Sequence, residues 1–349
     1  MKKILTVLLV VALLLGMSAC GTKSSEATNT PSDTTAAPAA TTAATTTAAP
    51  EASKLITVGF AQCKADESDW RKANTKSVQD ALSEANGFKL ILADSNNDAA
   101  KQVSDVQGFI DQEVDYIIIA AVNADGWDTV LANAKAAGIP VILMDRTINA
   151  SEDLYTCWLG GGFYNEGVKA TDWIAKRFPS DKKVNIVNLQ GQLGASAQVG
   201  RSQALDDGIA KNSNWKLLAR QTGEWSTDKA KEIMASWVKQ YGDEINCVYA
   251  ENDNMADGAI QALTEAGKKV GGKDGIAIIS FDANRAYLQM TLEGKINCDV
   301  ECNPLLGPGV ADIIKKIASG GTPNKKESVE ETAFYYDTIT QADIDARPY

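Results

Sequence analysis

The chain has 349 residues, with 34 basic and 45 acidic side chains and a formal charge of -11. This excess of acid argues against a nucleic-acid interface and a basic membrane-binding face, because both depend on clustered positive charge. The chain contains no histidine, which excludes His-based metal sites, Ser-His-Asp triads and imidazole general bases. Catalysis by paired carboxylates, or by a cysteine without histidine, stays possible in principle. The length allows about two domains of ordinary size.

The first residues, MKKILTVLLVVALLLGMSAC, predict a targeting segment. Lys2 and Lys3 form a basic start, and residues 4–15 form an apolar stretch too short for a typical membrane span. The segment resembles a bacterial lipoprotein signal, in which residues 1–19 are removed and Cys20 carries lipid. Ordinary secretion with Cys20 as a free thiol is the alternative. Both readings place the mature protein outside the cytoplasm.

Residues 20–53 are composed mainly of Thr, Ala, Ser and Pro, as in TTAATTTAAP. They show no apolar periodicity, so we expect a disordered tether between the lipidated cysteine and the folded part.

From residue 54 onward, apolar runs alternate with amphipathic stretches. The first series predicts strands at 55–61, 88–94, 115–121 and 140–145, with helices near 68–86, 98–112 and 126–137. The second series predicts strands at 184–190, 215–221, 245–250 and 276–282, with helices near 164–178, 196–212, 227–240 and 253–266. Two successive β-α series predict an α/β protein of two doubly wound lobes with parallel sheets and right-handed crossovers.

Ligands of open α/β sheets bind beyond the carboxyl ends of the strands. Asp145 and Arg146 follow the apolar run VILM, and Asp282 follows IAIISF. An exposed pair of charges would add little stability, so an acid and a base at a strand end indicate the mouth of a cleft. Carboxylates that accept, an arginine that donates two bonds and an indole face together suit a neutral polyhydroxylated ligand. By contrast, isolated polar residues at other strand ends (Asp125, Asp253 and Gln190) are interpreted as solvated or capping residues.

Two segments resemble known binding motifs but lack residues that those motifs require. The stretch 94–105, DSNNDAAKQVSD, opens like a calcium loop, but Ala99 replaces the turn glycine and Asp105 replaces the closing glutamate. We interpret it as a capped strand-to-helix loop. Glycines at 160–162 are followed by Gly167, so the dinucleotide spacing fails. A phosphate-binding P-loop is also absent, and no cofactor is expected.

Five cysteines follow Cys20, at positions 63, 157, 247, 298 and 302. An odd number outside the cytoplasm leaves at least one thiol unpaired in a monomer. Cys298 and Cys302 would lie roughly 13 Å apart on one extended strand, beyond the reach of a disulfide. Without a CxxC pair or a histidine, no metal site is expected.

Several segments together carry a family likeness. VGFAQ, GIPVILMDR, LQGQLGASAQVGR, YAENDNMADGAIQAL and ISFDANRAYLQ resemble sugar-binding proteins of the ribose and galactose type. ESDWR at 67–71, AAVNADGWDTVL at 120–131 and AFYY at 333–336 most resemble the galactofuranose-binding branch. The likeness extends from about residue 55 to the end of the chain.

The resemblance implies a type I periplasmic binding protein, in which two Rossmann-like lobes are joined by a hinge of three crossing segments. The expected lobes are 54–157 with about 302–330, and 158–301 with about 331–349. A sugar is expected between the lobes, which close on it by a hinge motion. The implied partners are the monosaccharide, the permease subunits of an ABC importer and the membrane through the lipid anchor, with the protein acting as a monomer.

The resemblance also implies a set of sugar-binding residues. It comprises Glu67, Trp70, Arg71, Asp145, Arg146, Arg201, Asn252, Asp282 and Glu301. The chain departs from the family pattern at Gly162, where relatives carry an aspartate that opens a helix. The segment CNPLLGP is also one residue shorter than in the branch. Whether Cys157 pairs across the hinge with Cys298 or Cys302 stays open.

The leading hypothesis is therefore a lipid-anchored extracytoplasmic receptor that passes a monosaccharide, with galactofuranose as first choice, to an ABC importer. The alternative is a sensory subunit that presents the sugar to a membrane kinase or chemoreceptor. An enzyme on a related fold is the third reading. It is disfavoured because the chain lacks histidine, a P-loop and the dinucleotide glycines, so no catalytic residue is expected.

Overall fold

The computed structural model describes residues 54–349. The predicted signal at 1–19, the lipidated Cys20 and the tether up to residue 53 lie outside the described residues. Among the helices of residues 54–349, none combines the length and the apolar character needed to cross a membrane.

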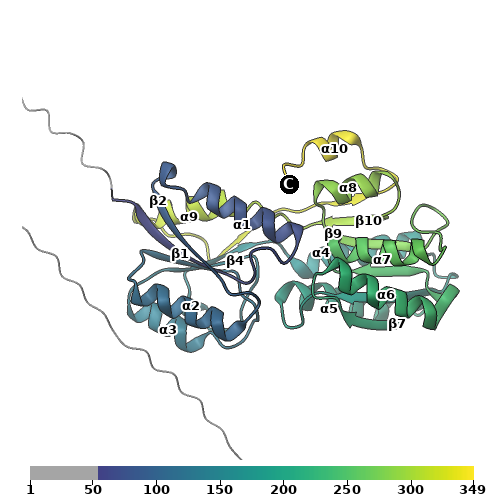
Figure 1. The fold of residues 1–349 in the computed structure, drawn as a ribbon, viewed down its shortest axis with the longest axis horizontal. Helices are drawn as coiled ribbons and strands as arrows, with labels where there is room; N and C mark the ends of the chain where they lie inside the picture. Colours follow the sequence, from purple (N-terminus) through teal and green to yellow (C-terminus); the bar gives the residue numbers. More distant parts are fainter. Residues whose placement is uncertain (1–53) are drawn as a thin grey trace, which may run out of the picture. The chain divides into compact units, whose positions relative to one another are not determined.

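The first of two six-stranded sheets has the order β11-β5-β4-β3-β1-β2, and its neighbouring strands all run parallel. Its strands are β1 (Ile56–Gln62), β2 (Phe88–Asp94), β3 (Tyr116–Ile119), β4 (Val141–Met144), β5 (Cys157–Gly160) and β11 (Lys326–Ser328). Helices α1 (Asp69–Ala81) and α9 (Gly307–Ala318) cover one face, and α2 (Ala99–Asp111) and α3 (Asp128–Ala136) cover the other (Figure 1).

Both faces of this sheet are apolar, as expected for parallel strands buried on two sides. In β3, Ile118 packs into the cluster that contains Val78 of α1 and Val310 of α9. Its neighbours Ile117 and Ile119 point to the opposite face and pack with the residues of α2 and α3. The two-residue period of a strand therefore fills two hydrophobic layers from one continuous apolar run.

The second sheet repeats this plan, with the order β12-β10-β9-β8-β6-β7. Its strands are β6 (Val184–Gln190), β7 (Trp215–Thr222), β8 (Cys247–Ala250), β9 (Ala277–Asp282), β10 (Cys298–Glu301) and β12 (Ala333–Tyr335). Only the pairing of β12 with β10 is antiparallel within these described strands. Helices α4 (Phe163–Arg177) and α5 (Ser196–Lys211) pack on one face, and α6 (Thr227–Tyr241) and α7 (Asp253–Glu265) pack on the other.

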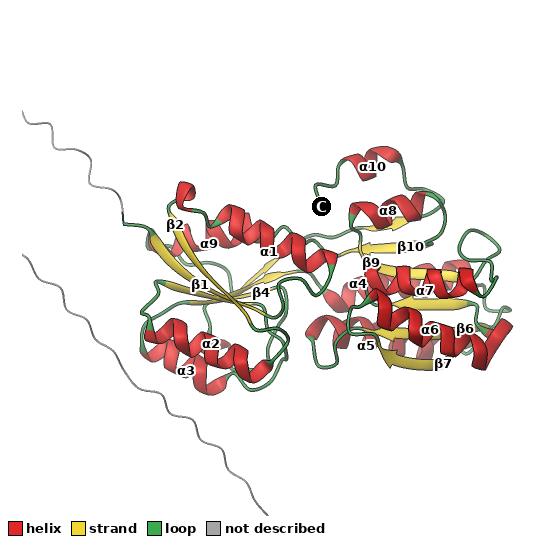
Figure 2. Ribbon diagram, in the orientation of Figure 1, coloured by secondary structure: helices red, strands yellow, loops and turns green. Residues whose placement is uncertain are grey.

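The predicted fold class is confirmed: two doubly wound lobes with mainly parallel sheets flanked by helices (Figure 2). The elements that were not predicted are short or lie late in the chain. They are β5, β10, β11, β12, α8 (Arg285–Leu292), α9, α10 (Gln341–Asp345) and three short 3-10 turns at Glu84–Asn86, Glu152–Leu154 and Gly242–Glu244.

Three chain segments connect the two sheets. Residues 161–162 lead from β5 to α4, residues 302–306 lead from β10 to α9, and residues 329–332 lead from β11 to β12. Because β5 pairs with β4, the chain stays in the first sheet as far as Gly160.

The loop that imitates a calcium site is a helix cap, as interpreted from the sequence. The side chain of Asp98 is the N-cap of α2 and accepts a hydrogen bond from the backbone N–H of Lys101 at 2.9 Å. The carboxylate of Asp94 accepts from the backbone N–H of Asn96. At the other imitation, Gly162 is the N-cap of α4 and provides no side-chain bond.

The five cysteines of the described chain are all buried and free. Cys157 therefore pairs with neither Cys298 nor Cys302 in this structure.

Candidate ligand-binding cavity

Two aspartates at strand ends occupy unusual backbone conformations. Asp145 directly follows β4 with a φ of 63°, and Asp282 ends β9 with a φ of 112°. Positive φ is uncommon for residues other than glycine, although Asp tolerates it better than bulkier residues. Such strain concentrates at functional sites, where the surrounding structure holds it in place. Both aspartates lie at the carboxyl ends of strands, one in each sheet.

A cavity lies at these strand ends. It is lined by Glu67, Ser68, Trp70, Arg71, Asp145, Arg146, Phe163, Ala197, Arg201, Trp225, Asn252, Asp282 and Cys302. Eight of the nine residues expected from the sequence are brought together here, and residues of both lobes contribute.

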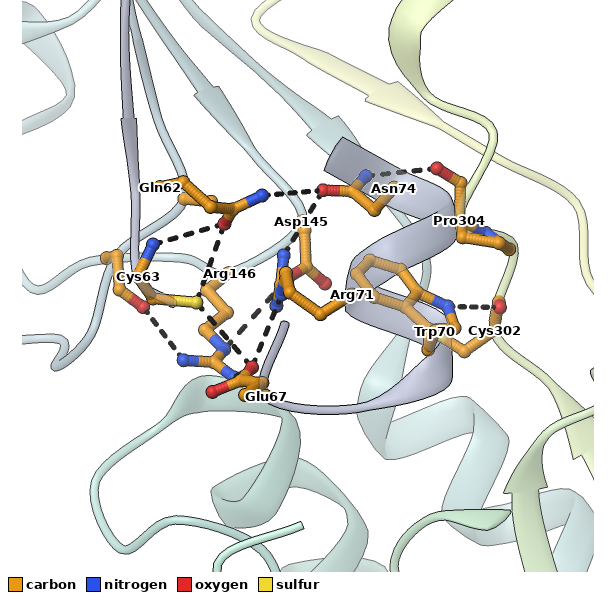
Figure 3. Close-up of polar contacts among 12 residues, drawn as sticks. Gln62, Cys63, Glu67, Trp70, Arg71, Asn74, Asp145, Arg146, Cys302 and Pro304 are labelled. Atoms are coloured by element: carbon orange, nitrogen blue, oxygen red, sulfur yellow. Dashed lines mark hydrogen bonds and ion pairs between the residues drawn. The ribbon is translucent and has the colours of Figure 1, made fainter. Parts of the chain in front are cut away.

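The first lobe supplies a closed network of four charged side chains (Figure 3). Arg71 contacts Asp145 at 2.5 Å and Glu67 at 3.3 Å, and Arg146 pairs with the same Glu67 oxygen. Each of these side chains is at most 5% exposed. Burial works to raise the pKa of the Glu67 carboxyl, but the guanidiniums of Arg146 and Arg71 hold it below its ordinary value.

The start of α1 fixes Arg71 in this network. Ser68 is the N-cap and accepts from the backbone N–H of Arg71. Asn74, one turn later, accepts from the Arg71 guanidinium at 3.3 Å and from Gln62 at 3.2 Å (Figure 3). The amide of Asn74 also donates to the carbonyl of Pro304 in a crossing segment. Buried bonds of this kind hold a guanidinium in one orientation.

Trp70 lies between the lobes. Its indole N–H donates to the carbonyl of Cys302 at 2.5 Å (Figure 3), and its ring packs among core residues of the second lobe. The Arg71 guanidinium lies 4.5 Å from the ring centroid, a cation–π distance. Trp70 therefore joins the charged network of the first lobe to the hinge and to the second lobe.

The second lobe contributes one arginine surrounded by acids. Arg201, on α5, donates from Nε to one oxygen of Glu166 at 2.7 Å, and its Nη2 lies 2.7 Å from the same oxygen. It also donates to the backbone carbonyl of Glu251 and lies 3.7 Å from Asp282. Arg201 and Glu166 are almost fully buried, at 2% and 1% exposed. Loss of either partner would leave an uncompensated buried charge.

More carboxyl groups lie behind this arginine than it can neutralise. Burial raises the pKa of Asp282, and the nearby charges of Asp253 and Glu166 act in the same direction, while Arg201 opposes them. Burial also raises the pKa of Asp253, to about 7, and that of Asp299. The carboxyl groups behind Arg201 therefore keep their protons to a higher pH than Glu67 of the first-lobe network does.

Asn252 caps a helix and also lines the cavity. It is the N-cap of α7, and its side-chain oxygen accepts from the backbone N–H of Met255 at 2.9 Å. Its side-chain amide points toward the carbonyl of Trp225 at 3.4 Å. The cap fixes the side chain, so the cavity wall is rigid at this point.

Trp225 is a cavity residue that the sequence reasoning missed. It follows β7 with a φ of 65°, and its ring lies where a side chain on Gly191 would collide with it. Applying the strand-end rule to the predicted strand at 215–221 would have found it. Phe163, at the start of α4, was missed because it follows a crossing segment and no predicted strand.

Glu301 is the expected site residue that does not line the cavity. Its carboxylate is engaged by Arg347 and by the backbone N–H of Thr332 at 3.1 Å. Trp127, in the segment 120–131 of the family likeness, is 2% exposed and donates to the carbonyl of Asn123, so it belongs to the core.

Three cavity residues carry buried polar atoms with no hydrogen-bond partner in residues 54–349. They are Oε2 of Glu67, Nε of Arg146 and Nε1 of Trp225. One is an acceptor and two are donors. An uncharged molecule with several hydroxyl groups can satisfy both kinds, because each hydroxyl donates and accepts.

Comparison with known proteins agrees with this geometry. Residues 58–322 match the family model described as periplasmic binding protein domain. The chain is 35% identical over 295 residues to the galactofuranose-binding protein YtfQ of Escherichia coli, covering 84% of this chain and 91% of that protein. The chain belongs to this periplasmic binding protein family.

Two solved structures are also similar. A crystal structure from Mycobacterium smegmatis in complex with β-D-fucofuranose is 41% identical with a TM-score of 0.77, covering 83% of this chain and 93% of that one. The binding component of the arabinose ABC transporter from Shewanella sp. ANA-3, bound to α- and β-L-arabinofuranose, is 34% identical with a TM-score of 0.77. That match covers 84% of this chain and 95% of the other.

Proposed function

We propose that this chain is a lipid-anchored extracytoplasmic binding protein that captures a monosaccharide between its lobes and delivers it to an ABC importer. Galactofuranose, or a related hexose or pentose in the furanose form, is the expected ligand. The ligand set consists of Glu67, Trp70, Arg71, Asp145, Arg146, Arg201, Asn252 and Asp282, with Phe163 and Trp225 added from the structure.

The observation that carries the proposal is the composition of the cavity wall. Buried carboxylates and guanidiniums alternate there with three aromatic side chains, Trp70, Phe163 and Trp225. Carboxylates accept from sugar hydroxyls, and guanidiniums donate to them in a planar fork. Aromatic faces cover the apolar C–H patches of a sugar ring. The charges largely neutralise one another, which favours a neutral ligand over an ionic one.

The similar proteins support a furanose in particular. One is named for galactofuranose, and two were solved with fucofuranose and arabinofuranose. These ligands belong to those proteins, and we infer the same class here because four of the five residues of ESDWR and the Asp145-Arg146 pair line the cavity.

The proposed mechanism is reversible binding with lobe closure and no covalent chemistry. Hydrogen bonds join residues of the two lobes in this structure. Asn254 donates to Asp69 at 3.1 Å. The backbone N–H of Thr147 donates to Ser196 at 2.9 Å. A ligand that contacts both lobes stabilises the closed state by its differential affinity for that state.

The anchor and the delivery step rest on the sequence. Cys20 and the Thr/Ala/Pro-rich stretch after it are the basis for lipidation, and the ABC importer is inferred from the family. The alternative, a sugar-sensing subunit for a membrane kinase or chemoreceptor, uses the same cavity. Sugar uptake by cells, lost when the gene for this chain is deleted and restored by the wild type, distinguishes transport from sensing.

A thermal-shift screen over pentoses, hexoses and furanosides tests the ligand class. A bound sugar at a hundred times its Kd stabilises a protein by about 2.7 kcal/mol, so at least one furanose should raise the Tm clearly. The matched control is Asp145→Asn, which should show a much smaller shift with the same sugar. Absence of any shift over the whole panel would contradict the sugar proposal.

A further inference from the structure

The three crossing segments meet at one side chain outside the cavity wall, that of Glu331. Glu331 lies on the third segment, between β11 and β12. One of its carboxylate oxygens accepts from the backbone N–H of Asn303, in the second segment, at 3.1 Å. A Cβ on Gly161, in the first segment, would overlap both of its oxygens. The carboxyl group therefore fills the junction of the hinge.

Glu331 lies beside Glu166, the partner of the cavity arginine. One carboxyl oxygen of Glu331, one of Glu166 and the sulfur of Cys302 all lie within 4.8 Å of one another. Glu166 is 1% exposed, and one of its oxygens accepts from Nε of Arg201 and forms the ion pair with Nη2. Its other oxygen is buried without a hydrogen-bond partner among the described residues.

The charges facing this pair leave one carboxyl uncompensated. The ion pairs of Arg201 go to Glu166 and Asp282, not to Glu331. Lys169, on α4, donates to the main-chain carbonyl of Glu331 instead of to its carboxylate. Cys302 contributes a thiol whose pKa is raised by burial and by the charges of Glu166 and Glu331. Two neighbouring carboxylates with one shared cation do not both ionise readily.

We propose that Glu331 holds a proton and donates it in a hydrogen bond to the unpartnered oxygen of Glu166. The proton comes from solvent and stays on the pair, and no covalent bond changes. Glu331 is then a positioning residue: it joins the three hinge segments to Glu166, and Glu166 orients Arg201 toward the cavity. The positioning role of Glu331 rests on the proposed function. The claim that Glu331 holds a proton does not depend on that function.

The ionisation of Glu331 agrees with this geometry. Burial raises its pKa to about 9, and the charge of Glu166 adds to the effect, while the N–H of Asn303 and the charge of Arg201 act against it. In the unfolded chain the carboxyl has an ordinary pKa of about 4.3. The folded protein thus retains a proton that the unfolded chain releases, so this contribution to stability is complete at low pH and is lost as the pH rises through about 9.

The test compares thermal unfolding of the wild type and Glu331→Gln between pH 5 and pH 9 without any sugar. The glutamine amide is neutral at every pH and keeps both a donor and an acceptor. We expect the Tm of Glu331→Gln relative to the wild type to rise by several degrees across this range. Glu330→Gln, at the exposed neighbour, should show no such trend. A difference between Glu331→Gln and wild type that is constant with pH would overturn the proposal.

Two further results bear on it. If Glu331→Gln does not fold, Glu331→Met replaces the side chain with a neutral one of equal length. Failure of both neutral variants to fold would overturn the proposal, because a protonated carboxyl tolerates a neutral substitute. Stoichiometric zinc in the purified protein, measured by elemental analysis, would also overturn it, because the carboxyl oxygens would then bind metal instead of a proton.

The positioning role has its own readout. Sugar affinity of the wild type should fall as the pH rises from 7 to 10, and this fall should be smaller in Glu331→Gln. If the unfolding data show the proton but affinity has the same pH profile in both proteins, the positioning role is wrong. If no sugar binds at all, the proposed function fails and the result on the proton stands independently.

Discussion

The buried carboxylates of the cavity are neutralised in different ways in the two lobes. In the first lobe, two guanidiniums and two carboxylates pair with one another: Arg71 and Arg146 with Glu67 and Asp145. In the second lobe, Arg201 faces a larger group of acids, which includes Glu166 and Asp282 in direct reach. In the first-lobe half of the cavity, ion pairs with arginine neutralise the buried carboxylates. In the second half, bound protons neutralise part of the buried negative charge as well. We therefore expect the first half to set the geometry of binding and the second half to make it depend on pH.

The largest effect should follow from Arg201→Ala. This change leaves Glu166 buried without its partner, which costs about 3–5 kcal/mol in a typical protein, and removes the only guanidinium that the second lobe contributes to the cavity wall. Denaturant unfolding should show the lost stability, and calorimetry should show no sugar binding. As a control, Arg285→Ala removes an arginine that is 57% exposed, and it should cost less than about 1 kcal/mol. Equal losses of stability in Arg201→Ala and Arg285→Ala would contradict the structural role given to the buried pair of Arg201 and Glu166.

Asp145→Asn tests the half that is neutralised by ion pairs. The asparagine tolerates the positive φ at this position but no longer pairs with Arg71 as a charge. We expect sugar affinity to fall by about 2–3 kcal/mol, roughly a hundredfold, because a buried charged hydrogen-bond partner is lost. Circular dichroism should show that the fold persists, and calorimetry measures the affinity. An unchanged affinity would place the sugar elsewhere.

The pH dependence of stability should differ between the halves. The pKa of Glu67 is lowered by Arg146 and Arg71 against the effect of burial, so its contribution is present above its ordinary pKa and is lost in acid. Burial raises the pKa of Glu251 and of Asp253 to about 7, so their contributions are lost as the pH rises through that value. We expect wild-type stability to decrease from pH 5 to pH 8 and Asp253→Asn to weaken this decrease. A slope unchanged by Asp253→Asn would show that the acids of the second lobe do not hold protons.

The smallest effect should come from the hydrogen bonds between the lobes at the rim. Asn254 and Tyr287 both donate to the carboxylate of Asp69, at 3.1 and 3.2 Å. Asn254→Ala removes two partly exposed bonds with Asp69, because the Asn254 amide donates to the Asp69 carboxylate and its oxygen accepts from the Asp69 backbone N–H. At about 0.5 kcal/mol each, the low end for a hydrogen bond, their loss should lower sugar affinity about 5-fold with a faster dissociation rate. Lys72→Ala, which removes an exposed partner of the same aspartate, should change it less. Stopped-flow dissociation kinetics distinguish the two.

The sequence predicted the fold and most of the cavity because both depend on local pattern. Apolar runs separated by amphipathic stretches indicated each long strand and helix. Asp145, Arg146 and Asp282 were found because they follow strongly apolar strands, while Glu67, Trp70, Arg71, Arg201 and Asn252 were assigned through the family resemblance. β5, with the sequence CWLG, was missed because it contains a single aliphatic side chain, whereas the equally short β3, YIII, and β4, VILM, are continuous apolar runs.

The parts that escaped prediction depend on contacts between distant segments. Phe163 and Cys302 of the cavity wall follow β5 and β10, and the strand-end rule was not applied to them because these two strands were not predicted. Glu301 was expected in the wall, but Arg347, near the end of the chain, engages its carboxylate instead. The role proposed for Glu331 depends on Gly161 and Asn303, which come together only when three segments cross.

The central claim is that one sugar is held by charged groups of both lobes. Its most direct test is calorimetric titration of the best furanose from the screen into the wild type, Asp145→Asn and Arg201→Lys. The account predicts one sugar per chain for the wild type and strongly weakened binding in both variants, because lysine cannot reproduce the planar fork of arginine. Wild-type affinity in both variants would contradict it.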